Sequence, residues 1–141
     1  MNEFVTQRCD EQDGKFIVER LNEYNKSKLD PLLEPDVIHI NRKITDENGD
    51  IIAAISGSVY LWNGMSIDMF WIHEDYRKKG IGTNLLGQVE NEARNKGCSF
   101  VHLDTFDFQA KDFCIKNGYE VFGVLDGYPD GHKRYSLKKA L

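Results

Sequence analysis

A short stretch near the middle of the chain combines residue types that bind phosphate. Three consecutive cations are followed by two glycines one residue apart: Arg77, Lys78, Lys79, Gly80 and Gly82. The cations attract anions, and a glycine has no Cβ, so a bulky anion can approach the main chain closely. The stretch therefore predicts a phosphate or pyrophosphate site. The alternative is a basic turn that leads into an ordinary surface helix.

The flanking residues predict a strand before this stretch and a helix after it. Residues 70–72 are large and favour β-structure, which is typical of a buried strand. Apolar residues at helical spacing predict a helix over residues 83–96, ended by Gly97: Leu85, Leu86, Val89 and Ala93. The first N–H groups of a helix lack intrahelical partners, and the helix dipole places partial positive charge there. The main chain would therefore add to the attraction for an anion.

Two familiar phosphate loops do not fit the stretch. The third glycine of a dinucleotide-binding loop is missing, and no Gly-Lys-Ser/Thr ending follows. The stretch does resemble the acyl-CoA pyrophosphate loop of the GNAT N-acetyltransferase superfamily, whose pattern is Arg/Gln-x-x-Gly-x-Gly/Ala. Here it is Arg77-x-x-Gly80-x-Gly82, between a predicted strand and a predicted helix.

Size and charge limit the classes of partner. The chain has 141 residues, of which 40% are hydrophobic and 29% charged, as in one globular domain with its own core. The net charge of −5 and the pI of about 5.3 argue against nucleic acid as a partner. No apolar run is long enough to cross a membrane, so no membrane partner is expected. The basic stretch thus favours one small anionic ligand.

The cysteines and the N-terminus predict a cytoplasmic protein. Cys9, Cys98 and Cys114 are odd in number and widely separated, with no disulfide or metal spacing. We therefore expect reduced thiols and no metal. Residues 1–4 lack the basic-then-apolar layout of a secretory signal.

The order of predicted elements is β-α-β-β-β-α-β-α-β-β, which GNAT enzymes also show. We expect a single α/β domain of mixed α+β type over residues 1–141, an acyl-CoA-binding N-acetyltransferase domain by this resemblance. Its mixed central sheet of about seven strands would be flanked by helices. The predicted strands span residues 4–9, 37–45, 51–60, 65–73, 99–104, 119–124 and 133–138, and the predicted helices span residues 16–28, 83–96 and 108–116.

A second motif supports the resemblance. Family members often carry Asn-x-x-Ala and then Phe/Leu-Tyr-x-Lys-x-Gly-Phe/Tyr; this chain has the corresponding residues Asp107, Ala110, Phe113, Cys114, Lys116, Gly118 and Tyr119. The tail from Tyr128 to Tyr135 also looks like that of a bacterial subgroup with Pro-x-Gly-His. Two residues depart from the pattern. Asp107 stands where an asparagine often contacts the pantetheine arm, and Cys114 stands where a tyrosine often protonates the departing thiolate.

By this resemblance, the last part of strand 65–73 would hold the pantetheine amide and the acyl carbonyl with its main chain. The arm of acetyl-CoA would lie where that strand splays from strand 99–104. The cofactor-binding residues implied are Trp71, Ile72, Arg77, Lys78, Lys79, Gly80, Ile81, Gly82, Thr83, Asp107, Phe113 and Lys116.

Acyl transfer to an amine needs a base, because a free alkylamine has a pKa of about 10.4 and attacks only when neutral. Asp68 is the first candidate, directly or through water. In a regular strand it would share a face with Phe70 and Ile72, where a carboxylate is either paired or functional; a solvent-facing strand residue is the alternative. Tyr119 is a candidate proton donor or a packed sheet residue. Cys114 occupies the family's catalytic position, with a small helix-face filler as the favoured alternative.

The acceptor pocket has no general sequence code. Tyr60, Trp62, Tyr128 and His132 are candidates for lining it, or simply half-buried aromatic and turn residues. The acidic net charge mildly favours a cationic amine.

Three hypotheses for the function follow. The leading one is an acetyl-CoA-dependent N-acetyltransferase that acts by direct transfer in a ternary complex on a small-molecule or peptide amine. The second is a non-catalytic acyl-CoA sensor or interaction module, motivated by Asp107 and Cys114. The third, a toxin or ribosome-directed acetylase, is disfavoured by the acidic balance. The oligomeric state is open, with a homodimer as one outcome.

Overall fold

The computed structural model describes residues 3–31, 37–60 and 62–141. The chain divides into two compact units, residues 1–32 and 33–141, and each is described by itself. The expectation of one domain over residues 1–141 stays a prediction. Across the described ranges, no helix is both long and apolar enough to cross a bilayer.

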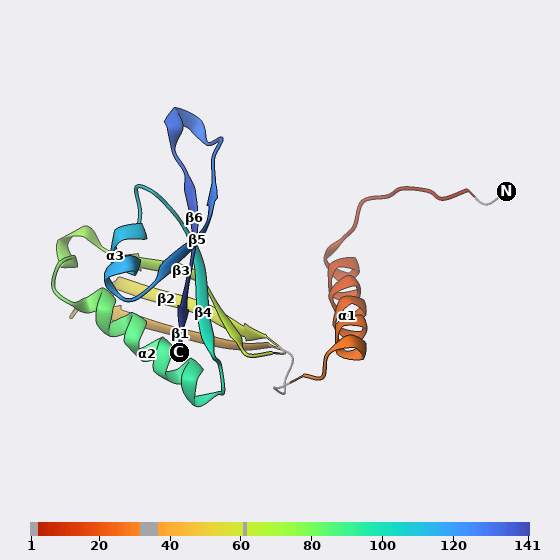
Figure 1. Cartoon of the computed structure of the whole chain (residues 1–141), viewed down its shortest axis with the longest axis horizontal. Coiled ribbons are helices and arrows are strands. Elements are labelled where there is room, and N and C mark those ends of the chain that lie inside the picture. Colours follow the sequence, from red (N-terminus) through yellow and green to blue (C-terminus); the bar gives the residue numbers. More distant parts are fainter. Residues whose placement is uncertain (1–2, 32–36, 61) are drawn as a thin grey trace. The chain divides into compact units, whose positions relative to one another are not determined.

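The first unit contains the helix α1 (Glu11–Lys28) (Figure 1). The Asp10 carboxylate accepts a hydrogen bond from the N–H of Asp13 at 2.8 Å, and the Asp13 carboxylate accepts one from the N–H of Asp10 at 2.9 Å. This capping box satisfies N–H groups that a helix start leaves unpaired. The helix therefore begins before residue 16, the start predicted from apolar spacing.

The predicted strand Phe4–Cys9 is wrong. Residues 3–10 form neither helix nor strand. A strand needs a neighbour to accept and donate its ladder hydrogen bonds, and the described residues of the first unit include no other strand. The predicted seventh strand is therefore absent from the sheet, which has six.

The described residues of the second unit form a mixed sheet and the α-helices α2 and α3 (Figure 1). Its elements are β1 (Val37–Thr45), β2 (Ile51–Tyr60), β3 (Gly64–Ile72), α2 (Ile81–Asn95), β4 (Phe100–Phe106), α3 (Lys111–Lys116), β5 (Glu120–Leu125) and β6 (Arg134–Ala140). The strand order is β1-β2-β3-β4-β6-β5. Only the β3–β4 pair is parallel; the other neighbouring pairs are antiparallel. From residue 37 onward, the element order is the predicted one.

Helix α2 connects the parallel strands β3 and β4 and packs against one face of the sheet (Figure 1). The predicted apolar stripe of this helix is confirmed, because its four members are at most 1% exposed: Leu85, Leu86, Val89 and Ala93. They share the core with Ile55, Val59, Met65 and Val101, from three neighbouring strands. This burial fixes the start of α2 beside the end of β3.

Strands β3 and β4 pair only at their beginnings. The register runs from Gly64 opposite Phe100 to Ser66 opposite His102 and stops there, although both strands continue. Beyond these pairs the two strands separate, or splay. Their N–H and C=O groups that face each other there are therefore not paired in a β-ladder. This is the splay that the resemblance implied.

Candidate active site

The loop between β3 and α2 turns sharply before the helix begins. After a short 3₁₀ turn (Glu74–Tyr76), Lys78 and Gly80 both have positive φ, 61° and 81°. Glycine adopts this conformation without steric cost, and a Cβ built on Gly80 would meet nothing within 4 Å. Gly80 is the N-cap of α2 and has no side chain to cap it. The first N–H groups of α2 thus face an open turn rather than a capping group.

Gly82, the second glycine of the motif, is needed for close packing rather than for a positive φ. A Cβ on Gly82 would lie 2.8 Å from Cδ1 of Ile72 and 3.1 Å from Cζ of Phe113. The first distance is too short for a real contact and the second is tight, so Gly82 allows α2 to pack closely against β3 and α3. The expectation that Gly82 admits an anion to the main chain stays a prediction, and the structure adds a packing role for this glycine.

Two cations of the loop, Arg77 and Lys79, contact neighbouring residues. The Nε of Arg77 donates a hydrogen bond to the main-chain oxygen of Ile72 at 3.0 Å, which ties the loop to the last residue of β3. This contact uses one of the five N–H donors of the guanidinium. The ammonium of Lys79 lies 5.5 Å from the ring centre of Tyr76, within cation–π range. Thr83 is exposed in the first turn of α2.

Asp68 lies in a β-bulge. Ser56 on β2 is opposite Met69, but the next residue, Gly57, is opposite Ile67, so Asp68 is the extra residue of β3. An extra residue shifts the alternation of side chains by one. Asp68 and Met69 are both exposed, whereas Ile67 belongs to the core. The expectation that Asp68 shares a face with Phe70 and Ile72 is therefore wrong: those two pack against the core on the α2 side, and Asp68 does not.

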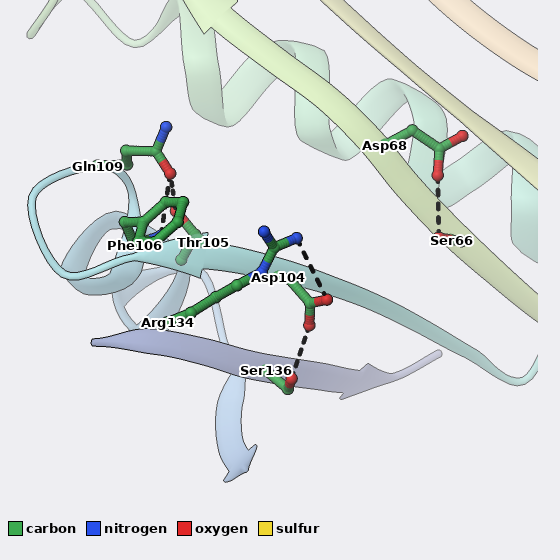
Figure 2. A network of polar contacts seen from close by, with 8 residues as sticks. All are labelled: Ser66, Asp68, Asp104, Thr105, Phe106, Gln109, Arg134 and Ser136. Carbon is green, nitrogen blue, oxygen red and sulfur yellow. Dashed lines mark hydrogen bonds and ion pairs between the residues drawn. The ribbon is translucent and has the colours of Figure 1, made fainter. Parts of the chain in front are cut away.

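Two hydroxyl groups orient the carboxylate of Asp68. Ser66 donates to one oxygen at 3.1 Å (Figure 2), and Ser58 donates to the other at 3.4 Å. The Oγ of Ser58 also lies 3.5 Å from Nδ1 of His39. The sequence did not single out Ser58 or Ser66, because alternate polar residues in a strand look the same whether they face solvent or a site. The result is an exposed, oriented carboxylate on one strand of the splay.

Asp104 lies on the other strand of the splay, as Figure 2 shows. Its carboxylate accepts a hydrogen bond from Ser136 at 2.6 Å and from Arg134 at 3.5 Å, both on β6. Alternate residues of β4, Val101 and Leu103, lie in the core with α2, so Asp104 projects from the opposite face of the sheet. Sequence reasoning also missed this residue, whose signal was only a polar residue at a strand end.

Cys114 and Tyr119 lie in the core on the α2 side and are 1% and 3% exposed. The Tyr119 hydroxyl donates to Glu90 of α2 at 2.7 Å, and Lys139 donates to the other oxygen of Glu90 at 3.0 Å. Burial, followed by the hydrogen bond and charge of Glu90, raises the pKa of Tyr119 far above its ordinary value. Burial and then the charge of Glu90 raise the pKa of the Cys114 thiol to about 11. Both groups hold their protons near neutral pH, and the sheet does not bring them to the face that carries Asp68.

Four of the predicted cofactor-binding residues fall into two groups by exposure. Trp71 is 47% exposed and Lys116 is exposed at the end of α3, whereas Ile72 and Phe113 pack partly buried against the core. Asp107 follows β4 directly, and its carboxylate contacts His132 and the N–H of Lys133. Burial favours its neutral form, but these hydrogen bonds outweigh burial, so the pKa of Asp107 lies below its ordinary value of 3.8.

Comparisons with known proteins match this geometry. Residues 7–134 fit the acetyltransferase (GNAT) family model. Blasticidin-S acetyltransferase of Streptomyces morookaense is 31% identical over 96 residues, which cover 67% of this chain and 70% of that protein. The crystal structure of an acetyltransferase from Bacillus cereus is 30% identical, with a TM-score of 0.85 and coverage of 98% of both chains.

An aminoglycoside 6'-N-acetyltransferase complexed with coenzyme A has a TM-score of 0.62 and 19% identity, over 77% of this chain and 75% of that one. At this identity the likeness concerns the fold alone. The similarity to solved structures confirms the predicted fold class, and the family match confirms the resemblance predicted from the two motifs. The chain belongs to the GNAT acetyltransferase family, the acyltransferases whose donor is acetyl-CoA.

Proposed function

We propose that this protein transfers the acetyl group of acetyl-CoA directly to a primary amine of a small molecule, in a ternary complex. One observation carries the proposal: β3 and β4 part next to the uncapped start of α2, where Lys78 and Lys79 add positive charge. A thioester carrier has an anionic diphosphate and a long amide-bearing arm, and this arrangement offers a place for each.

The donor site uses main-chain groups for most of its contacts. The diphosphate would accept hydrogen bonds from the first N–H groups of α2, at Ile81, Gly82 and Thr83, with Lys78 and Lys79 close by. The main chain of Trp71 and Ile72, at the end of β3 beyond its pairs with β4, would hold the pantetheine amide and the acyl carbonyl. These residue roles are part of the proposal.

Asp68 is the proposed base. The amine nitrogen attacks the thioester carbonyl carbon and loses a proton to the Asp68 carboxylate, directly or through a water. The carbon–sulfur bond then breaks, and the coenzyme A thiolate leaves and takes up a proton. A thiol has a pKa of about 8.5, so sulfur is a tolerable leaving group without a dedicated acid. Ser58 and Ser66 hold the base in place.

The proposed acceptor is a cationic small molecule. One relative named above, at 31% identity, is a blasticidin-S acetyltransferase. In this chain, Asp68 and Asp104 place carboxylates on the two strands that border the splay (Figure 2), and the net charge is −5. Electrostatic attraction would favour the approach of an amine that carries further positive charge.

Two measurements test this proposal. Calorimetry with coenzyme A should give saturable binding, and Lys79→Glu should weaken it by about tenfold, or about 1.4 kcal/mol. Lys43→Glu is the matched control, because Lys43 is an exposed lysine on β1. Absence of any heat with coenzyme A would overturn the donor site.

A sulfhydryl-release assay with blasticidin S, kanamycin, spermidine and a peptide N-terminus tests the transfer itself. Thiol release with at least one amine is the expected result. Binding of coenzyme A with no thiol release from any amine would favour the second candidate, a non-catalytic acyl-CoA sensor. The enclosed positions of Cys114 and Tyr119, which leave the departing thiolate without an obvious acid, are the observation behind that candidate.

A further inference from the structure

Asp107 and His132 join two loops beside the splay. Asp107 is the first residue after β4, and His132 lies two residues before β6. The Asp107 Oδ1 lies 2.8 Å from Nδ1 of His132. Because a carboxylate only accepts, Nδ1 carries the proton and donates it. The other oxygen accepts from the N–H of Lys133 at 3.1 Å, and the Asp107 N–H donates to the oxygen of Lys133 at 3.0 Å.

Aromatic rings add to this junction. Phe106 stacks on Phe108 with ring centres 5.3 Å apart and meets the edge of Tyr128 at 4.8 Å. Phe108 in turn lies edge-on to His132 at 4.9 Å. The loop between β5 and β6, residues 126–133, therefore packs against the end of β4 through Tyr128 and His132.

These contacts lie on the face of the sheet that carries the proposed amine site. Phe106 alternates with Asp104 along β4, so both project from the face opposite α2. Arg134 connects them, since its guanidinium lies 5.4 Å from the Phe106 ring centre and 3.5 Å from Asp104 (Figure 2). Asp68 lies on the facing strand of the splay.

The loop needs such contacts to keep one conformation. Gly127 and Gly131 both have positive φ, and so does Asp130, a non-glycine residue at 58°. Glycines enlarge the set of conformations available to a free loop, so ordering it costs more entropy. The hydrogen bonds that Asp107 makes with His132 and Lys133 connect this loop to the end of β4.

We propose that Asp107 and His132 are positioning residues: their pair holds the β5–β6 loop against the end of β4 and so fixes one wall of the amine site. The inference rests on the proposed function for the identity of that site. It gives Asp107 a task different from the pantetheine contact that the family pattern implied.

We call the hydrogen-bonded pair of Asp107 and His132 the latch. Hydrogen exchange of residues 126–133 and calorimetry with coenzyme A together test its role. Asp107→Ala and His132→Ala should each speed exchange of the loop by about tenfold, and the double variant should add little to either single one. His132→Asn should restore slow exchange, because its amide nitrogen can donate in the position of Nδ1. Asp126→Ala is the control, since Asp126 is an exposed carboxylate of the same loop, paired with Lys133 at 3.5 Å.

The affinity for coenzyme A should stay within about twofold in all these variants, and the KM for the best amine of the release panel should rise while that for acetyl-CoA stays constant. Unchanged exchange in Asp107→Ala would overturn the latch. Weaker coenzyme A binding with unchanged exchange would return Asp107 to the donor site. Exchange and calorimetry need no turnover, so the latch can fail or hold independently of the proposed transferase activity.

Discussion

The two faces of the sheet in the second unit use their polar residues differently. On the α2 side, the hydroxyl of Tyr119 and the carboxylate of Glu90 are buried, and the partly exposed ammonium of Lys139 completes their network beside the apolar core. On the opposite face, Asp68 and Asp104 are exposed carboxylates held by serine hydroxyls. Enclosure fixes a proton and stabilises the fold, whereas exposure leaves a carboxylate free to exchange a proton with a substrate. The chemistry is therefore expected on the second face.

Substitution of Asp68 tests the catalytic side of this contrast and has the largest expected effect. Asp68→Asn keeps the size of the side chain but removes the base, so kcat/KM should fall by about 10²- to 10⁴-fold. Asp112→Asn is the control, because Asp112 is 85% exposed on α3. Steady-state kinetics with the best amine measures both. A rate close to that of the unaltered protein in Asp68→Asn would place the base elsewhere.

Substitution of Tyr119 tests the enclosed network. Tyr119→Phe removes a donor to Glu90, which is only 6% exposed. The loss should lower the free energy of unfolding by about 1.5–3 kcal/mol, the usual range for a hydrogen bond to a charged group. Urea denaturation measures it. A large drop in kcat with unchanged stability would instead assign Tyr119 the proton-donor role predicted from its sequence position.

Substitution of Gly80 and Gly82 tests whether the two glycines at the start of α2 have different structural roles. Gly82→Ala should lower the free energy of unfolding by about 1–3 kcal/mol through overpacking. Ile72→Val removes the Cδ1 atom that the new Cβ would meet, so it should restore part of the loss. Gly80→Ala should cost about 1 kcal/mol from its backbone conformation and gain nothing from Ile72→Val. Equal rescue of both variants would contradict the packing role of Gly82.

The smallest expected effect is the pH dependence of the contribution that Asp107 makes to the free energy of unfolding. The pKa of Asp107 is lowered in the folded protein, so its contribution to stability is present above its ordinary value of 3.8 and is lost as pH falls below that value. The difference in unfolding free energy between the unaltered protein and Asp107→Ala should therefore shrink between pH 6 and pH 3. A difference that grows toward low pH would reverse the sign of this linkage.

Much of the second unit could be predicted from the sequence because its signals are local. The apolar spacing of Leu85, Leu86, Val89 and Ala93 defined α2, and the basic stretch with its glycines located the helix entrance. The strand predicted at residues 4–9 failed, since a strand depends on a neighbour that no local pattern specifies.

The site itself was only partly predictable. Asp68 was singled out, but its face was wrong because the bulge arises from the register of two strands. The partners of Asp107 and Tyr119 lie 25 and 29 residues away in sequence, so no spacing could reveal them.

The sequence by itself determined the element order from residue 37 onward and the family to which the chain belongs, because periodicity and short motifs are read from neighbouring residues. Only the tertiary structure decided which face of the sheet each polar residue occupies and what it contacts. A single extra residue in β3 reverses the direction of its side chains, and hydrogen bonds between distant segments settle whether a hydroxyl or carboxylate is enclosed or exposed.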